Sequence, residues 1–151
     1  MSTLTPSDPE FRTRVHSSFA SQRHMATLSA TLDEVEPGRV AIRLPYSESF
    51  TQQNGFMHAG AIASVADSAC GYAAYTLVPP TVNVLTVEYK VNLIAPARGV
   101  AFIARAEVLR AGRTLTICRA DVIALAADGD ANGQMVATML ATIMAVAPTH
   151  R

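Results

Sequence analysis

Cysteine, tryptophan and surplus charge are all scarce in this chain of 151 residues. Its two cysteines, Cys70 and Cys118, form no Cys-x-x-Cys pair, so reduced thiols in the core are favoured over a disulfide or a zinc site. Lysine plus arginine total 12, as do aspartate plus glutamate, and this balance gives no basic surplus for nucleic acid or an anionic membrane. We therefore expect no nucleic-acid partner, no membrane partner and no metal.

Repeats, low-complexity runs and interdomain linkers are also missing, and the length fits a single domain over residues 1–151. The polar stretch Met1–Pro6 has no apolar signal region, so we expect a cytoplasmic protein. Hydrophobic residues, by contrast, make up 50% of the chain and charged residues only 16%. Such an apolar composition in a small domain indicates that part of the surface is covered in an oligomer.

Helical and strand-like patterns follow one another in a clear order. The first half predicts a helix over about 9–24 capped by Asp8, strands over 28–35 and 38–44, a polar loop over 46–57, and a helix over about 59–78 that ends at Pro79-Pro80. The last of these is long enough to raise the question of a membrane span. Because it contains Asp67 and several hydroxyl residues, we expect instead a buried helix, whose small residues let a sheet approach closely.

After Pro80 the apolar residues recur at every second position, which is typical of a strand. This alternation places Leu85, Val87, Tyr89, Val91 and Leu93 on one face, and Thr86, Glu88, Lys90 and Asn92 on the other. Further strands are expected over about 100–109, 114–126 and 135–146, separated by turns at 111–113 and 128–133. The order predicts an α+β domain in which a long antiparallel meander wraps around one central helix.

Asp67 lies in the middle of the apolar helix, where an ionised carboxylate without a partner is costly. It is either an ordinary carboxylate at an exposed edge or beside an arginine, or a general base or nucleophile with an environment suited to that role.

His58, Ala59 and Gly60 stand where the polar loop meets this helix. Backbone N–H groups in a first helical turn have no intrahelical acceptor, and small residues there let a ligand reach them. A thioester carbonyl oxygen, which becomes negative during acyl transfer, is a group that such a turn stabilises. The alternative is structural: His58 caps the turn and Gly60 allows close packing.

The spacing of His58 and Asp67 has a geometric consequence. Nine helical residues turn about 900° and rise roughly 13 Å, so the two side chains of one chain point to opposite sides. If both act on one substrate, the helix start of one subunit must meet Asp67 of another. This predicts a homodimer with two shared sites, and it leaves open whether dimers pair into a homotetramer.

The segment Gly55-Phe56-Met57-His58-Ala59-Gly60, followed by Asp67, resembles the G-x-x-H-G-G…D motif of hotdog-fold acyl-CoA thioesterases of the phenylacetate-degradation (PaaI-like) type. The resemblance extends over most of the chain, including the Gly112-Arg113-Thr114 hairpin. It implies a hotdog fold, a long antiparallel sheet wrapped around one helix. Ala59 stands where the motif usually has glycine, which keeps the backbone N–H but narrows the approach to it.

The resemblance implies a role for each matching residue. Asp67 would be the catalytic carboxylate, attacking directly or activating water, and the Ala59 amide would polarise the thioester carbonyl. His58 would orient the loop or the thioester, and Thr86 would help to hold the attacking water. Gln52 stands where an asparagine often completes the site, with Asn54 as its alternative. Substrate contacts are expected from Asn54, Gly55, Gly60 and Arg113.

Four cations could meet the phosphates of coenzyme A: Arg113, Arg110, Lys90 and Arg98. Each is individually more often an ordinary solvated cation, and Arg113 is preferred because it lies in a tight hairpin. Met25, Met57, Tyr72 and Tyr75 would either line an acyl tunnel or pack in the core.

The favoured function is hydrolysis of a medium-chain or aromatic acyl-CoA to the free acid and CoA, with no cofactor beyond the CoA of the substrate. Two alternatives remain open: a hotdog enoyl-CoA hydratase or dehydratase, and a non-catalytic acyl-CoA-binding or regulatory protein. A serine hydrolase using Ser64 is disfavoured because the G-x-S-x-G elbow is missing.

Overall fold

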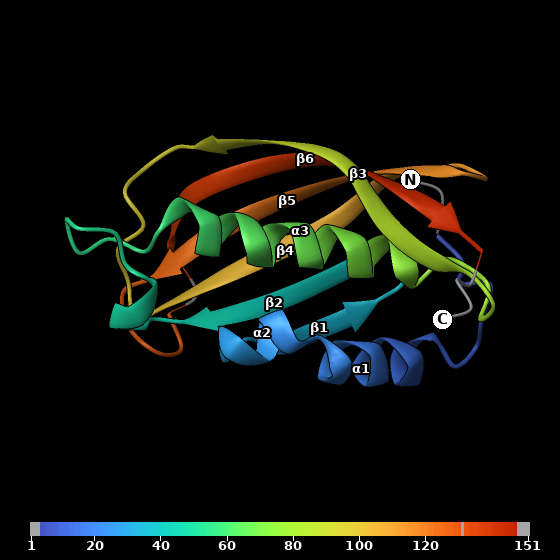
Figure 1. Cartoon of the computed structure of the whole chain (residues 1–151), viewed down its shortest axis with the longest axis horizontal. Helices are drawn as coiled ribbons and strands as arrows, with labels where there is room; N and C mark the ends of the chain where they lie inside the picture. The colour runs from blue at the N-terminus through green and yellow to red at the C-terminus, as the bar shows by residue number, and fades with distance from the viewer. Residues whose placement is uncertain (1–3, 131, 148–151) are drawn as a thin grey trace.

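One long helix lies across a face of a six-stranded antiparallel sheet in the computed structural model, which describes residues 4–130 and 132–147 (Figure 1). This confirms the expected α+β class and hotdog arrangement. The elements are α1 (Phe11–Ser21), α2 (Arg23–Thr27), β1 (Thr31–Glu36), β2 (Arg39–Pro45), the 3-10 turn η1 (Glu48–Phe50), α3 (Ala59–Tyr75), β3 (Asn83–Leu93), β4 (Ala101–Ala111), β5 (Leu115–Leu125) and β6 (Gln134–Val146).

The strand order is β1-β2-β4-β5-β6-β3. The expected meander is therefore wrong at its first strand, because β3 crosses to the far edge of the sheet and pairs with β6, while β4 pairs with β2. Alternation of apolar residues identifies a strand, but it does not say which strand will be its neighbour. As a result, β3 has a neighbour on one side only.

Side chains alternate between the two faces of the sheet, and the row that faces α3 is buried. On β5, for example, Cys118, Ala120 and Val122 are each fully buried. The side of α3 that meets them is rich in alanine, including Ala66 and Ala69, and these small side chains let helix and sheet backbones come close. One strip of α3 stays open to solvent, so the expectation of a fully enclosed helix is wrong for that strip.

The two cysteines join α3 to the sheet as free, buried thiols, which confirms the prediction of reduced core cysteines. The Cys118 thiol donates a weak hydrogen bond to the Cys70 carbonyl at 3.5 Å. The interaction with the Cys118 side chain, together with burial, raises the pKa of the Cys70 thiol. Cys70 therefore stays protonated and is no nucleophile.

The helix α3 ends at Tyr75, three residues before the expected end. The Thr76 hydroxyl donates to the Ala73 carbonyl at 2.7 Å, and the Leu77 N–H turns to the Ala74 carbonyl at 3.0 Å. The helix therefore ends in a tighter last turn, ahead of the two prolines that were expected to stop it. No helix among residues 4–130 and 132–147 is long and apolar enough to cross a membrane.

The N-terminal arm, α1 and α2, is two helices where one was expected. Asp8 accepts a hydrogen bond from the Glu10 N–H at 2.9 Å as predicted for a cap, but the helix itself begins at Phe11. The helix breaks at Gln22, whose ψ of 98° is extended.

The arm lies along the β1 side of α3 (Figure 1). Residues 1–3, at the start of the polar N-terminal stretch, and Ala131 of an expected turn lie outside the described residues.

Arg14 fastens this arm to the end of α3. Its guanidinium donates hydrogen bonds to the carbonyls of Tyr75 at 3.1 Å, Val78 at 2.8 Å and Pro79 at 3.2 Å. Its Nε lies 2.8 Å from Asp8 Oδ2, as an ion pair rather than an aligned hydrogen bond, and the Arg14 side chain is only 15% exposed. One side chain thus bonds the carbonyl of the last residue of α3, which has no intrahelical partner, and two carbonyls of the loop that follows it.

We expect Arg14→Ala to lower the free energy of unfolding by about 2–4 kcal/mol, because carbonyls and the Asp8 carboxylate lose a shared charged donor in a half-buried place. Arg12→Ala is the matched control on the same helix. Arg12 pairs with Glu36 at 2.5 Å, but its side chain is 54% exposed, so the expected loss is below about 1 kcal/mol. Urea unfolding measures both, and equal losses in the two variants would contradict the clamp role of Arg14.

Candidate active site

A groove of about 590 Å³ runs along the open strip of α3 and contains Asp67. Its floor is formed by Asp67, Ser68, Gly71, Tyr72 and Tyr75 of α3. One wall is the N-terminal arm, and the other is the start of β3 with the end of β6, on the two sides of α3 in Figure 1. The lining residues of these walls are Ser18, Ser21, Gln22, Asn83, Val84, Leu85, Thr86 and Val146.

Asp67 has one hydrogen-bond partner in the described part of the chain, Thr86. The Thr86 hydroxyl donates to Asp67 Oδ1 at 2.7 Å. This bond joins the floor of the groove to its β3 wall and fixes the direction of the carboxylate. No arginine or lysine pairs with Asp67 among the described residues, so the expected alternative of a carboxylate beside an arginine is not what the structure shows.

Thr86 reaches Asp67 because β3 has a bulge at Val87. Thr86 pairs with Ile143 of β6, whose side chain is buried against α3, and the next pair joins Glu88 to Thr142. Val87 is therefore an extra residue, and it reverses the alternation after it. The predicted faces are wrong in consequence: Thr86 shares the helix-facing side with Tyr89, and Leu85 shares the outer side with Glu88.

A second hollow, of about 420 Å³, lies beside the first turn of α3. Gln52, Ala59 and Ile62 line it from the loop and the helix, and Leu93 lines it from the end of β3. Its other lining residues are Phe56, Met57, Ile94, Ala95, Pro96, Ala97 and Val136. The Ala59 N–H has no acceptor among the described residues, so a backbone donor is free at this hollow.

The loop before α3 is a tight hairpin, closed by hydrogen bonds from the Gln52 N–H to the Phe56 carbonyl at 2.8 Å and from the Gly55 N–H to the Gln52 carbonyl at 3.0 Å. Gly55 has φ +83°, which explains the glycine. The Gln52 side-chain oxygen accepts a hydrogen bond from the Asn54 N–H. Gln52 lines the second hollow and Asn54 does not, so of the two amides the structure brings only Gln52 to it.

His58 caps α3. Its Nδ1 accepts a hydrogen bond from the Gly60 N–H at 2.8 Å, so that amide is already occupied. A Cβ on residue 60 would lie 3.0 Å from His58 Nδ1, which gives Gly60 a local reason to be glycine. The predicted capping role of His58 is therefore confirmed. Gly60 is exposed and a Cβ there would meet only the His58 ring, so its glycine serves the cap and not close packing of the helix.

The two hollows lie at opposite ends of β3. The groove with Asp67 touches the first four residues of the strand, Asn83 to Thr86, and the hollow with Ala59 touches its last residue, Leu93. Within one chain the structure therefore does not bring Ala59 and Asp67 into one cavity.

The candidate cations differ in where they lie. Arg98 stacks on Phe56 at 5.1 Å, at the edge of the hollow with Ala59. Arg113 is exposed in the turn between β4 and β5, at the end of the sheet where β3 begins. Lys90 pairs with Leu140 on the outer face of the sheet and points away from α3.

The expected acyl-tunnel residues divide into two pairs. Met25 and Met57 are core residues, at 0% and 3% exposure, and Met57 also lines the hollow with Ala59. Tyr72 and Tyr75 line the groove. Burial raises the pKa of the Tyr72 phenol, and its hydrogen bond with Ser18 opposes that shift.

Sequence reasoning missed the arm residues that line the groove, Ser18, Ser21 and Gln22. The signal for them was weak, because serine and glutamine near the end of an exposed helix are ordinary. Ser68 donates to the Gln22 side-chain oxygen at 3.4 Å, a contact between residues 46 positions apart.

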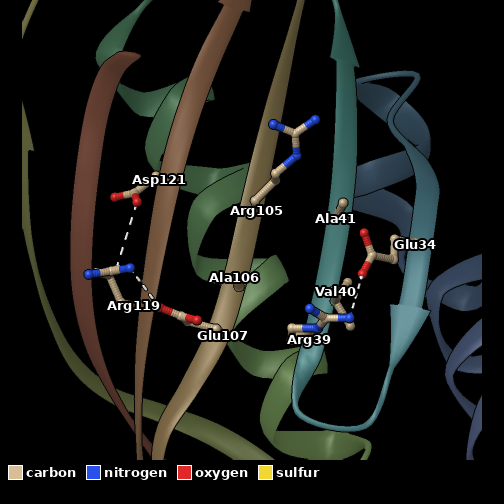
Figure 2. Close-up of a pocket in the computed structure, with 9 residues that line it drawn as sticks. All are labelled: Glu34, Arg39, Val40, Ala41, Arg105, Ala106, Glu107, Arg119 and Asp121. Atoms are coloured by element: carbon tan, nitrogen blue, oxygen red, sulfur yellow. Dashed lines mark hydrogen bonds and ion pairs between the residues drawn. The ribbon is translucent and has the colours of Figure 1, made fainter. Parts of the chain in front are cut away.

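A third hollow, of about 240 Å³, lies on the outer face of the sheet, opposite α3 (Figure 2). Its acidic groups are paired within the chain: Glu34 with Arg39 at 3.5 Å, and Arg119 with Glu107 at 2.6 Å and with Asp121 at 3.7 Å. The carboxylates of this third hollow are paired with arginines, and the hollow lies on the face of the sheet opposite Asp67. It is therefore not a candidate active site. In residues 4–130 and 132–147 there is no cluster of three His, Cys, Asp or Glu side chains that could hold a metal ion.

The family model of the thioesterase superfamily matches residues 54–126, from the loop before α3 to just past β5. A thioesterase family protein from Silicibacter pomeroyi shares 48% sequence identity and a TM-score of 0.87 with this chain, over 91% of this chain and 99% of that one. The chain belongs to the thioesterase superfamily.

A further relative agrees with that membership in sequence, and a solved structure agrees in fold alone. The Halobacterium salinarum protein "Putative esterase VNG_1336C" is 32% identical over 118 residues, which cover 75% of this chain and 78% of that one. The PaaI protein of E. coli, from the phenylacetic acid degradation operon, shares the fold, with a TM-score of 0.81 at 13% identity over 93% of this chain and 96% of that one. The expected family is confirmed at the level of the thioesterase superfamily, and the expected enzyme class, a thioester hydrolase, is confirmed with it. The PaaI-like type and the acyl-CoA substrate stay predictions.

Proposed function

We propose that this thioesterase-superfamily protein hydrolyses an acyl-CoA to the free acid and CoA. The observation that carries the proposal is the hydrogen-bonded pair Asp67–Thr86, which stands in an open groove without a cationic partner among the described residues. A carboxylate held in this way, beside space for a substrate, is suited to removing a proton from water. The reaction needs no metal and no cofactor beyond the CoA of its substrate.

In the proposed reaction, Asp67 acts as the general base. The Thr86 hydroxyl occupies Oδ1 and leaves Oδ2 for a water molecule. The water oxygen attacks the thioester carbonyl while Asp67 takes its proton. The tetrahedral intermediate then expels the CoA thiolate, which takes up the proton that Asp67 removed from water. The products are the carboxylic acid and the CoA thiol, and Asp67 is again a carboxylate.

The developing negative charge on the carbonyl oxygen needs a donor, and we assign that role to the Ala59 N–H. This amide lies at the first position of α3, where the helix adds partial positive charge, and it has no acceptor among the described residues. We assign to Gln52, which lines the same hollow, a contact with the thioester.

Ala59 and Asp67 meet only if two copies of the chain combine. β3 is the last strand of the sheet and is 11 residues long, so its outer edge is a template for pairing. Full antiparallel overlap with β3 of a second copy puts the first residue of one strand opposite the last residue of the other. The groove of one copy then adjoins the hollow of its partner, and the homodimer has two shared sites.

The CoA part of the substrate carries phosphates that require cations near the site. Arg98 is our first candidate, because its guanidinium stacks on Phe56 at the edge of the hollow with Ala59. Arg113 is the second, because its turn lies at the end of the sheet where β3 begins and where a paired copy would place its own hollow.

Release of free thiol from acyl-CoAs of different length tests the function. We expect turnover of at least one medium-chain or aromatic acyl-CoA. Tight binding without thiol release would show an acyl-CoA-binding protein, and enoyl-CoA hydration without thiol release would show a hydratase. A strictly monomeric protein with full activity would contradict the shared site.

We expect Thr86→Val to lower kcat by about tenfold, because Asp67 loses the hydroxyl that orients it, and Thr86→Ser to retain most of the activity. Thr142→Val is the control, since Thr142 donates a similar hydrogen bond to Glu88 on the outer face. If Thr86→Val kept full kcat, or if Thr142→Val lost as much, the positioning role of Thr86 would be wrong. Steady-state kinetics with one acyl-CoA measure all three variants.

A further inference from the structure

Gly71 is a glycine in the interior of α3, where glycine weakens a helix relative to alanine. Apart from its chain neighbours and the nearby backbone of α3 itself, no atom of the described residues lies within 4 Å of the position that a Cβ would take. Close packing within the chain therefore does not require glycine at this position. Gly60 is different, because a Cβ there would press against the His58 ring at 3.0 Å.

The open space above Gly71 is the groove itself. Gly71 lies four residues after Asp67, on the same side of α3 and about 6 Å further along its axis. Tyr75 lies one turn beyond, and all three residues form part of the groove floor. A side chain at position 71 would therefore project into the groove between the carboxylate and the Tyr75 end.

The walls at this point have different chemistry. On the β3 side, Val84 and Val146 provide apolar surface. On the arm side, Ser18 and Ser21 provide hydroxyls. An extended acyl chain can lie against the apolar wall and leave the hydroxyls in contact with water.

We infer that the acyl chain of the substrate runs along α3 from Asp67 over Gly71 toward Tyr75, and that Gly71 determines how long an acyl chain is accepted. This inference rests on the proposed function and names the part of the site that selects the substrate. Acyl groups that extend a helical turn, about 6 Å, or more beyond the thioester carbon would cross Gly71, whereas an acetyl group would not reach it.

The test compares Gly71→Ala, Gly71→Leu and wild type on acetyl-CoA, hexanoyl-CoA and decanoyl-CoA. We expect Gly71→Leu to lower kcat/KM for decanoyl-CoA at least about tenfold and to change that for acetyl-CoA less than about twofold. Gly71→Ala should raise Tm by about 2–4 °C, because it strengthens the helix without a clash. Ser17→Leu introduces the same side chain on an exposed face of α1 outside the groove lining and should leave the length profile unchanged.

A second measurement separates this inference from the proposed function. Calorimetry with a decanoyl-CoA thioether, which cannot be hydrolysed, should show weaker binding to Gly71→Leu than to wild type. If wild type released no thiol but Gly71→Leu bound the thioether more weakly, the role of Gly71 would be supported and the proposed function would be wrong. If wild type hydrolysed acyl-CoAs and Gly71→Leu had the same length profile, the proposed function would be supported and the role of Gly71 would be wrong. Loss of the dimer in Gly71→Leu would overturn the inference, since the space would then belong to a second copy.

Discussion

Replacing Asp67 with asparagine is expected to lower kcat for acyl-CoA hydrolysis by about 10²–10⁴-fold with little change in stability. Asparagine has nearly the same shape and can still accept the Thr86 hydrogen bond through its amide oxygen, so the groove keeps its form. It cannot take a proton from water, and a positioned base is worth about this factor. Stopped assays of thiol release, together with Tm, measure the two effects.

Asp121 supplies a matched control for this variant. It accepts a hydrogen bond from the Thr138 hydroxyl at 2.6 Å and so forms a second Asp–Thr pair. Unlike Asp67–Thr86, which joins α3 to β3, this pair joins β5 to β6 on the outer face of the sheet. Asp121→Asn should leave kcat within about twofold, because this carboxylate does not touch the groove. Activity that survives in Asp67→Asn would remove Asp67 from the reaction.

The second large effect is expected for Ala59→Pro, which removes one N–H and little else. Proline suits the first position of a helix, and His58, which precedes it, already has the extended conformation that a residue before proline requires, with ψ 139°. Loss of a single donor to the carbonyl oxygen is expected to lower kcat by about 10²–10³-fold. Ala59→Ser keeps the N–H and should retain most of the activity.

The two inactive variants together test the shared site. We expect dimers purified with one Asp67→Asn chain and one Ala59→Pro chain to have about half the wild-type activity per dimer, because one of their two sites combines an intact Ala59 with an intact Asp67. Differently tagged chains, co-expressed and purified through both tags, provide these dimers. No recovery of thiol release would show that each site is built from a single chain.

Much of the fold could be predicted from the sequence where the signal is local. The strand patterns place β4, β5 and β6 within two residues of their observed bounds, because alternation and turn residues act over a few positions. The helix α3 begins at Ala59 as expected, since a capping residue and small residues mark its first turn. Its end was less predictable, because it depends on the side chain of Thr76.

The candidate site was predictable in its residues but only partly in its arrangement. Asp67 and Ala59 stand out as a carboxylate in an apolar helix and a small residue at its start. The contact of Thr86 with Asp67 did not follow from alternation, which placed Thr86 on the polar side of its strand. The bulge at Val87 lets Thr86 share the α3 side of the strand with Tyr89. No residue type in that stretch predicts a bulge.

By itself, the sequence determined the family motif, the central helix and the conclusion that His58 and Asp67 of one chain point apart, because helical geometry converts spacing into direction. The tertiary structure alone decided that β3 lies at the sheet edge, that the N-terminal arm forms a wall of the Asp67 groove, and that the space above Gly71 is open. These features depend on which distant segments pack together. Such contacts are selected by the burial of the whole chain and not by neighbours in sequence.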